Sequence, residues 1–246
     1  TATPQVAEDI MEKLRFQEKT LIKSGFERPN LSYIVRKVED KSGQLLNICG
    51  SVAGTGIVYV RSRAKTEELA AFLNANGISA SFYHAGLGPD SRADRQEQWK
   101  KDKIRVMVCT NAFGMGIDKS NVSYVIHYNM PKSLEAYYQE AGRAGRDGEK
   151  ADCMLLYSGQ DIFTAKWMIE NNPPNEALSA DDQAAVRKQD LERLNSMIDY
   201  CLRDECLRNS ILRYFGESPK EDCHDCSYCN GGRYQQQTRK SVAAAR

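Results

Sequence analysis

Two arginines in a glycine-rich segment are the residues of this sequence best suited to grip a phosphate group. The segment YYQEAGRAGRDG, residues 137–148, places Arg143 and Arg146 three positions apart. A guanidinium holds phosphate through a planar fork of N–H donors, and glycine lets a backbone approach a ligand closely. Two arginines that only form surface salt bridges with neighbouring acidic residues are the alternative interpretation.

Four cysteines near the C-terminus follow the pattern C-x16-C-x2-C-x2-C and comprise Cys206, Cys223, Cys226 and Cys229. This spacing favours a tetrahedral structural zinc site over free core cysteines or a redox pair. Cys201 and His224 lie near enough to compete as ligands, but Cys201 falls within the preceding helix, whereas Cys206 begins a new one. Four protein ligands leave no open coordination position, so the metal would pin a helical hairpin to the rest of the chain.

The composition suits an intracellular protein with one ordinary domain and a smaller appendage. The chain has 246 residues, 41% of them hydrophobic, and 34 basic residues balance 33 acidic ones. Because the net charge is only +1, any binding of nucleic acid must be local. No stretch has the length and apolarity of a membrane span or a signal peptide, and most cysteines outside the cluster lie in apolar segments, which favours a reduced compartment.

Short β-branched segments alternate with helical patterns through most of the chain. Strands are predicted at 32–38, 56–60, 79–84, 104–110, 122–128 and 153–157, and helices between them at 64–77, 90–102 and 133–142. Strands separated by single helices predict an α/β fold with a doubly wound parallel sheet, whose functional loops follow the carboxyl ends of the strands. The large aromatic residues in helical patterns are predicted to be core: Phe72, Trp99 and Trp167.

A polar, proline-containing linker at 170–183 ends this alternation. Helices are predicted after it at 181–204 and 206–216, followed by the cysteine segment, and the tail 231–246 has no apolar periodicity and is predicted to be disordered. We expect four regions: a helical lead-in at 1–25, the α/β domain at 26–172, a helical hairpin with the metal site at 173–230, and the tail.

A phosphate cradle that would complement the arginines is missing from the printed sequence. GSVAGTG at 50–56 is the nearest match to a P-loop, but no Lys-Ser or Lys-Thr follows it and it precedes a strand instead of a helix. The acidic pair in RDECL, 203–207, has no apolar strand before it, so it is not a magnesium-binding box. The arginines therefore lack a nucleotide pocket of their own.

Several of these segments resemble the RecQ family of superfamily 2 DNA helicases. Residues 113–148 resemble helicase motifs V and VI, 58–70 resemble motif IV, and the four cysteines match the family's zinc-binding module with bacterial-like spacing. FYHAGL at 82–87 and FERPNL at 26–31 are similar to flanking segments of the second RecA-like lobe. TATP at the start resembles motif III, so a first lobe bearing the P-loop is expected upstream.

The resemblance implies roles for the motif residues in binding ATP and Mg²⁺ between two lobes. Arg146 would be the arginine finger that stabilises charge on the transferred phosphoryl group, and Arg143 is the second choice for this role. Such a finger raises the rate of hydrolysis by about 10³ or more. Gln139 would couple the nucleotide site to DNA, and Asp118 would contact the sugar or orient an arginine. Gly114 and Gly116 would let the backbone approach the nucleotide closely.

For DNA, the resemblance implies contacts to phosphates instead of base readout, as suits a translocase. The residues expected to make them are Ser62, Arg63, His84, Thr110 and Asn111. Without the resemblance, His84 would be read as a loop histidine with a backbone partner and Arg63 as a solvated charge at a helix start.

The resemblance thus implies the second lobe and zinc module of an ATP-dependent 3′→5′ DNA helicase of recombination and repair, inactive without its first lobe. Expected partners are single-stranded and partly duplex DNA and that first lobe, with no membrane. The expected location is the bacterial cytoplasm at the nucleoid. A non-catalytic zinc-containing adaptor is one alternative, and an RNA helicase of the same superfamily is another, although it would have no reason to carry the cysteine module.

Overall fold

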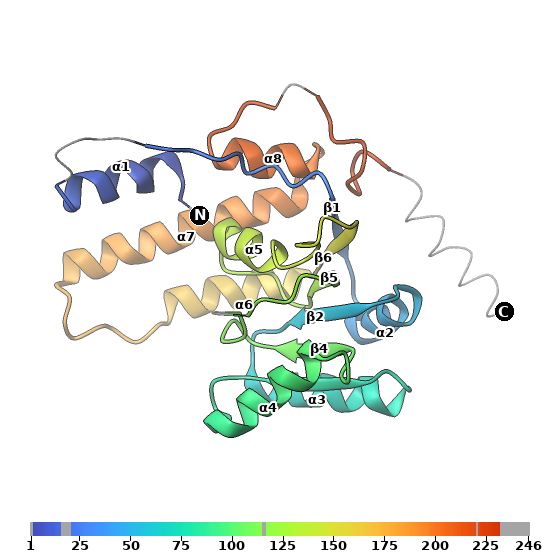
Figure 1. Ribbon diagram of the computed structural model, residues 1–246. Coiled ribbons are helices and arrows are strands. Elements are labelled where there is room, and N and C mark those ends of the chain that lie inside the picture. The colour runs from blue at the N-terminus through green and yellow to red at the C-terminus, as the bar shows by residue number, and fades with distance from the viewer. Residues whose placement is uncertain (1, 16–20, 115–116, 220, 232–246) are drawn as a thin grey trace.

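A computed structural model describes residues 2–15, 21–114, 117–219 and 221–231, and its centre is a six-stranded sheet (Figure 1). All neighbouring strands pair in parallel, in the order β1-β6-β5-β2-β4-β3. The strands are β1 (Leu31–Lys37), β2 (Thr55–Tyr59), β3 (Ala80–Tyr83), β4 (Val106–Cys109), β5 (Val122–His127) and β6 (Ala151–Tyr157). The predicted parallel sheet and its six strands are confirmed.

The helices of the described residues are α1 (Pro4–Lys13), α2 (Lys41–Ser51), α3 (Arg63–Ala75), α4 (Pro89–Lys100), α5 (Leu134–Ala141), α6 (Gly159–Glu170), α7 (Ala180–Leu202) and α8 (Leu207–Tyr214). Sequence patterns did not predict α2 or α6. The carboxylate of Asp40 accepts from the N–H of Gly43 at the start of α2, and that of Asp161 accepts from the N–H of Ser158 at the start of α6. Such capping contacts are the local signal for a helix start. None of the described helices is both long and apolar enough to cross a membrane.

Apolar side chains cover both faces of the sheet, which makes it doubly wound. Successive residues of β5 alternate between two core clusters, since Val125 joins one and Ile126 the other. One cluster contains Leu45 of α2 and Leu69 of α3, and the other contains residues of α4, α5, α7 and α8. Figure 1 shows α3 and α4 near β4 and α8 near β1, at opposite ends of the sheet.

The core prediction holds for Trp99 and fails for Trp167. The indole of Trp99 is fully buried and donates a hydrogen bond to the carbonyl of Gly56 over 3.3 Å, while Phe72 is half-buried. Trp167 is 55% exposed, because α6 packs on α7 and turns Asp161 and Ala165 inward. The two helices form a hairpin that projects away from the strands (Figure 1), so its outer face stays in solvent.

A buried ion pair joins α2 to the start of α6. The ammonium group of Lys41 contacts the carboxylate of Asp161 and also donates to the carbonyls of Tyr128, over 2.7 Å, and Leu156, over 3.1 Å. Burial lowers the pKa of Lys41, and Asp161 opposes that shift. Burial alone would raise the pKa of Asp161, but hydrogen bonds from Lys41 and Asn129 outweigh it and lower the pKa. The pair fixes the hairpin to the ends of β5 and β6.

Asp161→Asn is expected to destabilise the fold by about 3–5 kcal/mol, because it leaves the buried ammonium of Lys41 without its countercharge. Urea unfolding followed by circular dichroism measures this change in the free energy of unfolding. Glu97→Gln, which removes one partner of the exposed Lys101–Glu97 pair, is the matched control and should change little. Equal, small effects in the two variants would contradict a structural role for the buried pair.

Candidate functional site

The turn that carries the two arginines follows α5 directly. The hydroxyl of Ser133 accepts a hydrogen bond from the backbone N–H of Ala136 and caps the helix at its predicted start. The helix ends at Ala141, within one residue of the predicted end at 142. Gly145 has φ of 55°, and a Cβ there would lie 2.7 Å from the carbonyl oxygen of Glu149, so the turn requires glycine.

Two residues that precede β1 hold this turn in place. Arg28 donates to the carbonyls of Ala144 and Gly145, each over 3.0 Å, and Asn30 donates to those of Gly145 and Glu149, each over 2.8 Å. The backbone of the turn therefore has its shape fixed by side chains more than a hundred residues away. Sequence reasoning missed both residues, because no local pattern connects them to the turn.

The two arginines differ in how free they are to reach a ligand. Arg143 is half-buried and donates to the carbonyl of Gly114 over 2.6 Å, and a Cβ at Gly114 would lie 2.2 Å from its guanidinium. Arg146 is 38% exposed and lies 3.4 Å from the carboxylate of Asp118, which is 92% exposed. The structure thus brings Asp118 and Arg146 together at the surface, and it uses Gly114 for close approach to Arg143.

The structure gives less detail about the other two residues predicted for the nucleotide site. Gln139 is exposed on α5, and Gly116 lies outside the described residues.

A further residue, Lys119, anchors the segment next to Asp118. Its buried ammonium donates to the carbonyl of Lys100 over 3.1 Å and contacts Asp102 over 2.7 Å. Hydrogen bonds from Lys119 and from the hydroxyl of Thr55 lower the pKa of Asp102.

The predicted DNA contacts follow strands that are neighbours in the sheet. Ser62 and Arg63 come after β2, Thr110 and Asn111 after β4, and His84 after β3. Because β2, β4 and β3 are adjacent and parallel, their carboxyl ends meet at one edge. Arg63 and Asn111 are exposed there, whereas Thr110 is buried and the hydroxyl of Ser62 caps α3.

His84 is only 5% exposed, and both of its ring nitrogens have partners. Nδ1 accepts a hydrogen bond from the backbone N–H of Gly86 over 3.1 Å, and Nε2 lies 3.0 Å from the carboxylate of Glu67. This arrangement fits the simpler interpretation, a loop histidine with a backbone partner, and positions His84 to shape the loop at 85–88.

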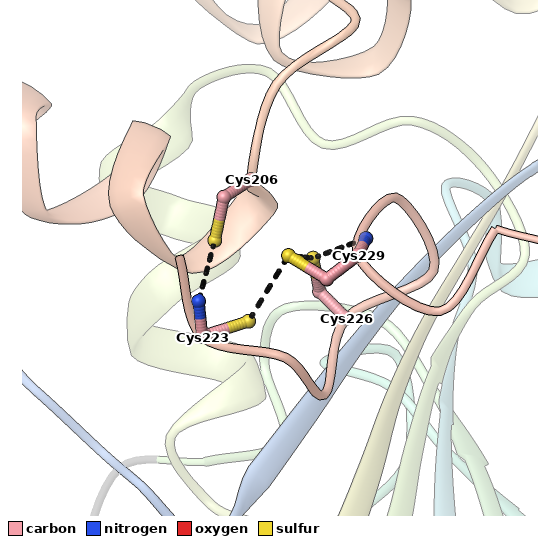
Figure 2. Close-up of side chains that lie close together, drawn as sticks. All are labelled: Cys206, Cys223, Cys226 and Cys229. Carbon is pink, nitrogen blue, oxygen red and sulfur yellow. Dashed lines mark hydrogen bonds between the residues drawn. The ribbon is translucent and has the colours of Figure 1, made fainter. Parts of the chain in front are cut away.

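The four predicted cysteines converge on one point (Figure 2), with their sulfur atoms within 4.8 Å of one another. The Sγ atoms of Cys226 and Cys229 are 3.4 Å apart and those of Cys223 and Cys229 are 3.9 Å apart. Sulfurs at about 2.3 Å from a tetrahedral zinc ion would be about 3.8 Å apart, so the set fits zinc. Cys206, Cys223, Cys226 and Cys229 form this group within the described residues.

Backbone N–H groups also support thiolates at this site. Cys206 accepts from the N–H of Cys223 over 3.3 Å, and Cys226 accepts from the N–H of Leu207 over 3.4 Å. A hydrogen bond from the Cys223 thiol lowers the pKa of Cys226 to about 4. Cys201 lies outside this convergent group, and burial raises the pKa of its thiol to about 12.

The cysteine segment and α8 are docked firmly on the α/β domain. The backbone N–H of Ser227 donates to the carbonyl of Tyr33 over 2.9 Å and so covers the free edge of β1. The ring of Phe215, just after α8, stacks on Phe26 with centroids 4.5 Å apart, and the Tyr214 hydroxyl donates to Glu135 of α5 over 2.7 Å. The metal segment therefore supports the helix that leads into the arginine turn.

Two protein families match consecutive parts of the chain. Residues 40–148 match the helicase conserved C-terminal domain and residues 159–230 match the RecQ zinc-binding domain. The chain belongs to the RecQ helicase family. The RecQ assignment also accounts for the order of the features, since the arginine turn closes the first matched region and all four cysteines lie in the second.

Curated relatives agree with the RecQ assignment. The chain is 42% identical over 234 residues to "ATP-dependent DNA helicase RecQ" of Bacillus subtilis, covering 95% of this chain and 38% of the relative. It is 38% identical to "ATP-dependent helicase SGS1" of Saccharomyces cerevisiae, covering 93% of this chain and 16% of the relative. The chain thus spans well under half the length of either relative.

Solved structures confirm the RecA-like α/β fold. Saccharomyces cerevisiae Dbp5 bound to RNA and ADP BeF3 superposes with a TM-score of 0.57 at 22% identity, covering 79% of this chain and 53% of that one. A DEAD box protein from Methanococcus jannaschii gives a TM-score of 0.52 at 23% identity, covering 69% of this chain and 47% of that one. The predicted RecA-like fold and RecQ membership are both borne out.

Cys206→Ser is expected to lower the zinc bound per chain, because it removes a buried thiolate from the convergent set. Cys201→Ser is the matched control, since it changes a cysteine five residues away that lies outside the set. Metal analysis of protein purified without chelator should find one zinc ion per chain in the unaltered protein and in Cys201→Ser. Zinc retained by Cys206→Ser and lost from Cys201→Ser would overturn the ligand assignment.

Proposed function

We propose that this chain forms the arginine-bearing lobe and zinc module of an ATP-dependent DNA helicase of the RecQ type, acting with 3′→5′ polarity in recombination and repair. The observation that carries the proposal is the exposed pairing of Arg146 with Asp118, at the end of a turn whose backbone is fixed by Arg28 and Asn30. A guanidinium held in this way is ready to contact a phosphate that another lobe supplies.

The geometry supports different roles for the two arginines. Arg146 is exposed and would act as the finger that stabilises charge on the transferred phosphoryl group. Arg143 donates one N–H to the carbonyl of Gly114, so it would hold the loop after β4 at that residue. Gln139 would couple the site to DNA, and Gly114 would leave room for the Arg143 guanidinium. Gly116, which lies outside the described residues, would let the nucleotide come close.

ATP with Mg²⁺ would be held mainly by a P-loop lobe, because the printed sequence carries no P-loop lysine. When bound, the metal would neutralise part of the charge of the phosphates. This chain's own contribution is to orient Arg146, through Asp118 and the clamped turn, toward the facing lobe. We therefore infer that the chain alone does not hydrolyse ATP.

Single-stranded DNA is proposed to run across the carboxyl edge of the sheet. Arg63 and Asn111 are exposed at that edge and would offer guanidinium and amide groups to phosphates, while Ser62, which caps α3, and the buried Thr110 would shape the loops beside them. His84 would contribute by holding its loop, since its ring is already engaged. Contacts to the backbone alone suit an enzyme that must move along any sequence.

Structural zinc is proposed at Cys206, Cys223, Cys226 and Cys229. The ion would hold the 223–229 loop in the shape that places Ser227 on β1 and would secure α8 behind α5. Its function in the helicase would be to stabilise the lobe. A zinc-containing adaptor without catalysis is the second candidate, because the convergent cysteines fit either role.

Arg146→Ala is expected to lower the kcat of DNA-stimulated ATP hydrolysis by about 10³ or more in protein that carries a P-loop lobe before this chain. Steady-state kinetics with single-stranded DNA measures the change. Arg193→Ala is the matched control, because Arg193 is a partly exposed arginine of α7 that pairs with Asp190. Unchanged kcat in Arg146→Ala would remove the finger role and leave the adaptor as the better account.

A further inference from the structure

A pocket of about 520 Å³ lies between the carboxyl edge of the sheet and the hairpin formed by α6 and α7. Arg61 and Asn111 line it from the loops after β2 and β4, and Lys132 from the loop after β5. The hairpin supplies the facing wall with Met168 and Arg187. The pocket therefore continues the edge at which DNA is proposed to bind, and Asn111 belongs to both.

Unpaired charge in this pocket is positive. Within the part of the chain that the structure describes, the side chains of Arg61, Lys132 and Arg187 form no ion pair or hydrogen bond. Both acidic groups of the pocket have partners: the carboxylate of Glu140 lies 2.9 Å from Nε2 of His127, and that of Asp190 lies 3.5 Å from Arg193. Three free cations outnumber the two partnered acids, so the pocket favours an anionic ligand.

The walls of the pocket also carry apolar surface that a small anion would not use. Met168 is 49% exposed and Val186 is 46% exposed, and both line the pocket together with Ile169 and Leu178. Exposed apolar side chains beside free cations match a nucleic acid strand, which offers phosphates and the flat faces of bases within one residue. Free phosphate would leave these side chains uncovered.

The two walls are fixed to each other before any ligand binds. The side-chain oxygen of Asn129 accepts from the backbone N–H of Arg61 over 3.2 Å, and its amide donates to Asp161 of α6 over 3.0 Å. Asp161 in turn holds the buried ammonium of Lys41. The hairpin is therefore held at a set position beside the loop after β2, which lowers the ordering cost of binding.

We propose that the α6–α7 hairpin extends the DNA-binding edge, with Arg187 and Lys132 contacting phosphates of single-stranded DNA that lies in this pocket. This inference rests on the proposed binding of DNA at the carboxyl edge of the sheet. It assigns a direct contact to a helix whose alternating charges, read from the sequence, indicate only a solvated face.

Arg187→Ala and Lys132→Ala are each expected to weaken binding of fluorescein-labelled oligo(dT) by about fivefold at low salt, as measured by fluorescence anisotropy. Each should also lower the slope of log affinity against log salt by about 0.7, the value for one phosphate contact of a single strand. Lys188→Ala is the matched control, because it removes one positive charge from the next position of α7, outside the pocket lining.

The outcomes separate this inference from the function on which it rests. Weaker binding in Arg63→Ala with unchanged binding in Arg187→Ala and Lys132→Ala would overturn the hairpin contact and leave DNA binding at the sheet edge intact. Equal losses of DNA affinity in Arg187→Ala and Lys188→Ala would show that only the overall charge of the helix matters, and would also overturn the contact. No binding by the unaltered chain would contradict both proposals.

A second measurement locates the strand directly. Acetylation of lysines, followed by mass spectrometry, should show Lys132 protected by oligo(dT) and Lys188 unprotected. Inorganic phosphate at matched ionic strength should give no protection, because it does not cover the apolar walls. Equal protection by phosphate would show an anion site and overturn the assignment to DNA.

Discussion

Parallel pairing of β1 with β6 is the interaction on which the other features of this lobe depend. All seven residues of β1 are in register with β6, from Leu31 opposite Ala151 to Lys37 opposite Tyr157. The residues just before β1 then reach the arginine turn, because that turn leads into β6. The free edge of β1 receives Ser227 from the cysteine loop. One strand therefore joins the predicted phosphate site to the metal segment.

This arrangement gives a physical reason for the cysteine segment to lie beside the α/β domain that carries the arginine turn. The cysteine loop stabilises β1, β1 positions Arg28 and Asn30, and those side chains shape the turn that presents Arg146. A second route runs from α8 to α5 through the hydrogen bond between Tyr214 and Glu135. If the cysteines hold zinc as proposed, its loss would loosen the arginine turn without any contact between the two sites.

Much of the fold could be predicted from local patterns, and the tertiary contacts could not. The cap at Ser133, the end of α5 and the four cysteines are readable from spacing, because each depends on neighbours in sequence. The clamp by Arg28 and Asn30 joins residues more than a hundred positions apart, so no spacing reveals it. Trp167 was predicted as core because periodicity does not tell which face of a projecting hairpin is covered.

The central claim is that Arg146 acts on a nucleotide held by a different lobe. The most direct test compares ATP hydrolysis by this chain alone with hydrolysis by the same chain preceded by a P-loop helicase lobe, each with and without single-stranded DNA. The account predicts no turnover from the chain alone and DNA-stimulated turnover from the longer protein. Turnover by the chain alone, retained after further purification, would reveal a nucleotide cradle within these residues and contradict the account.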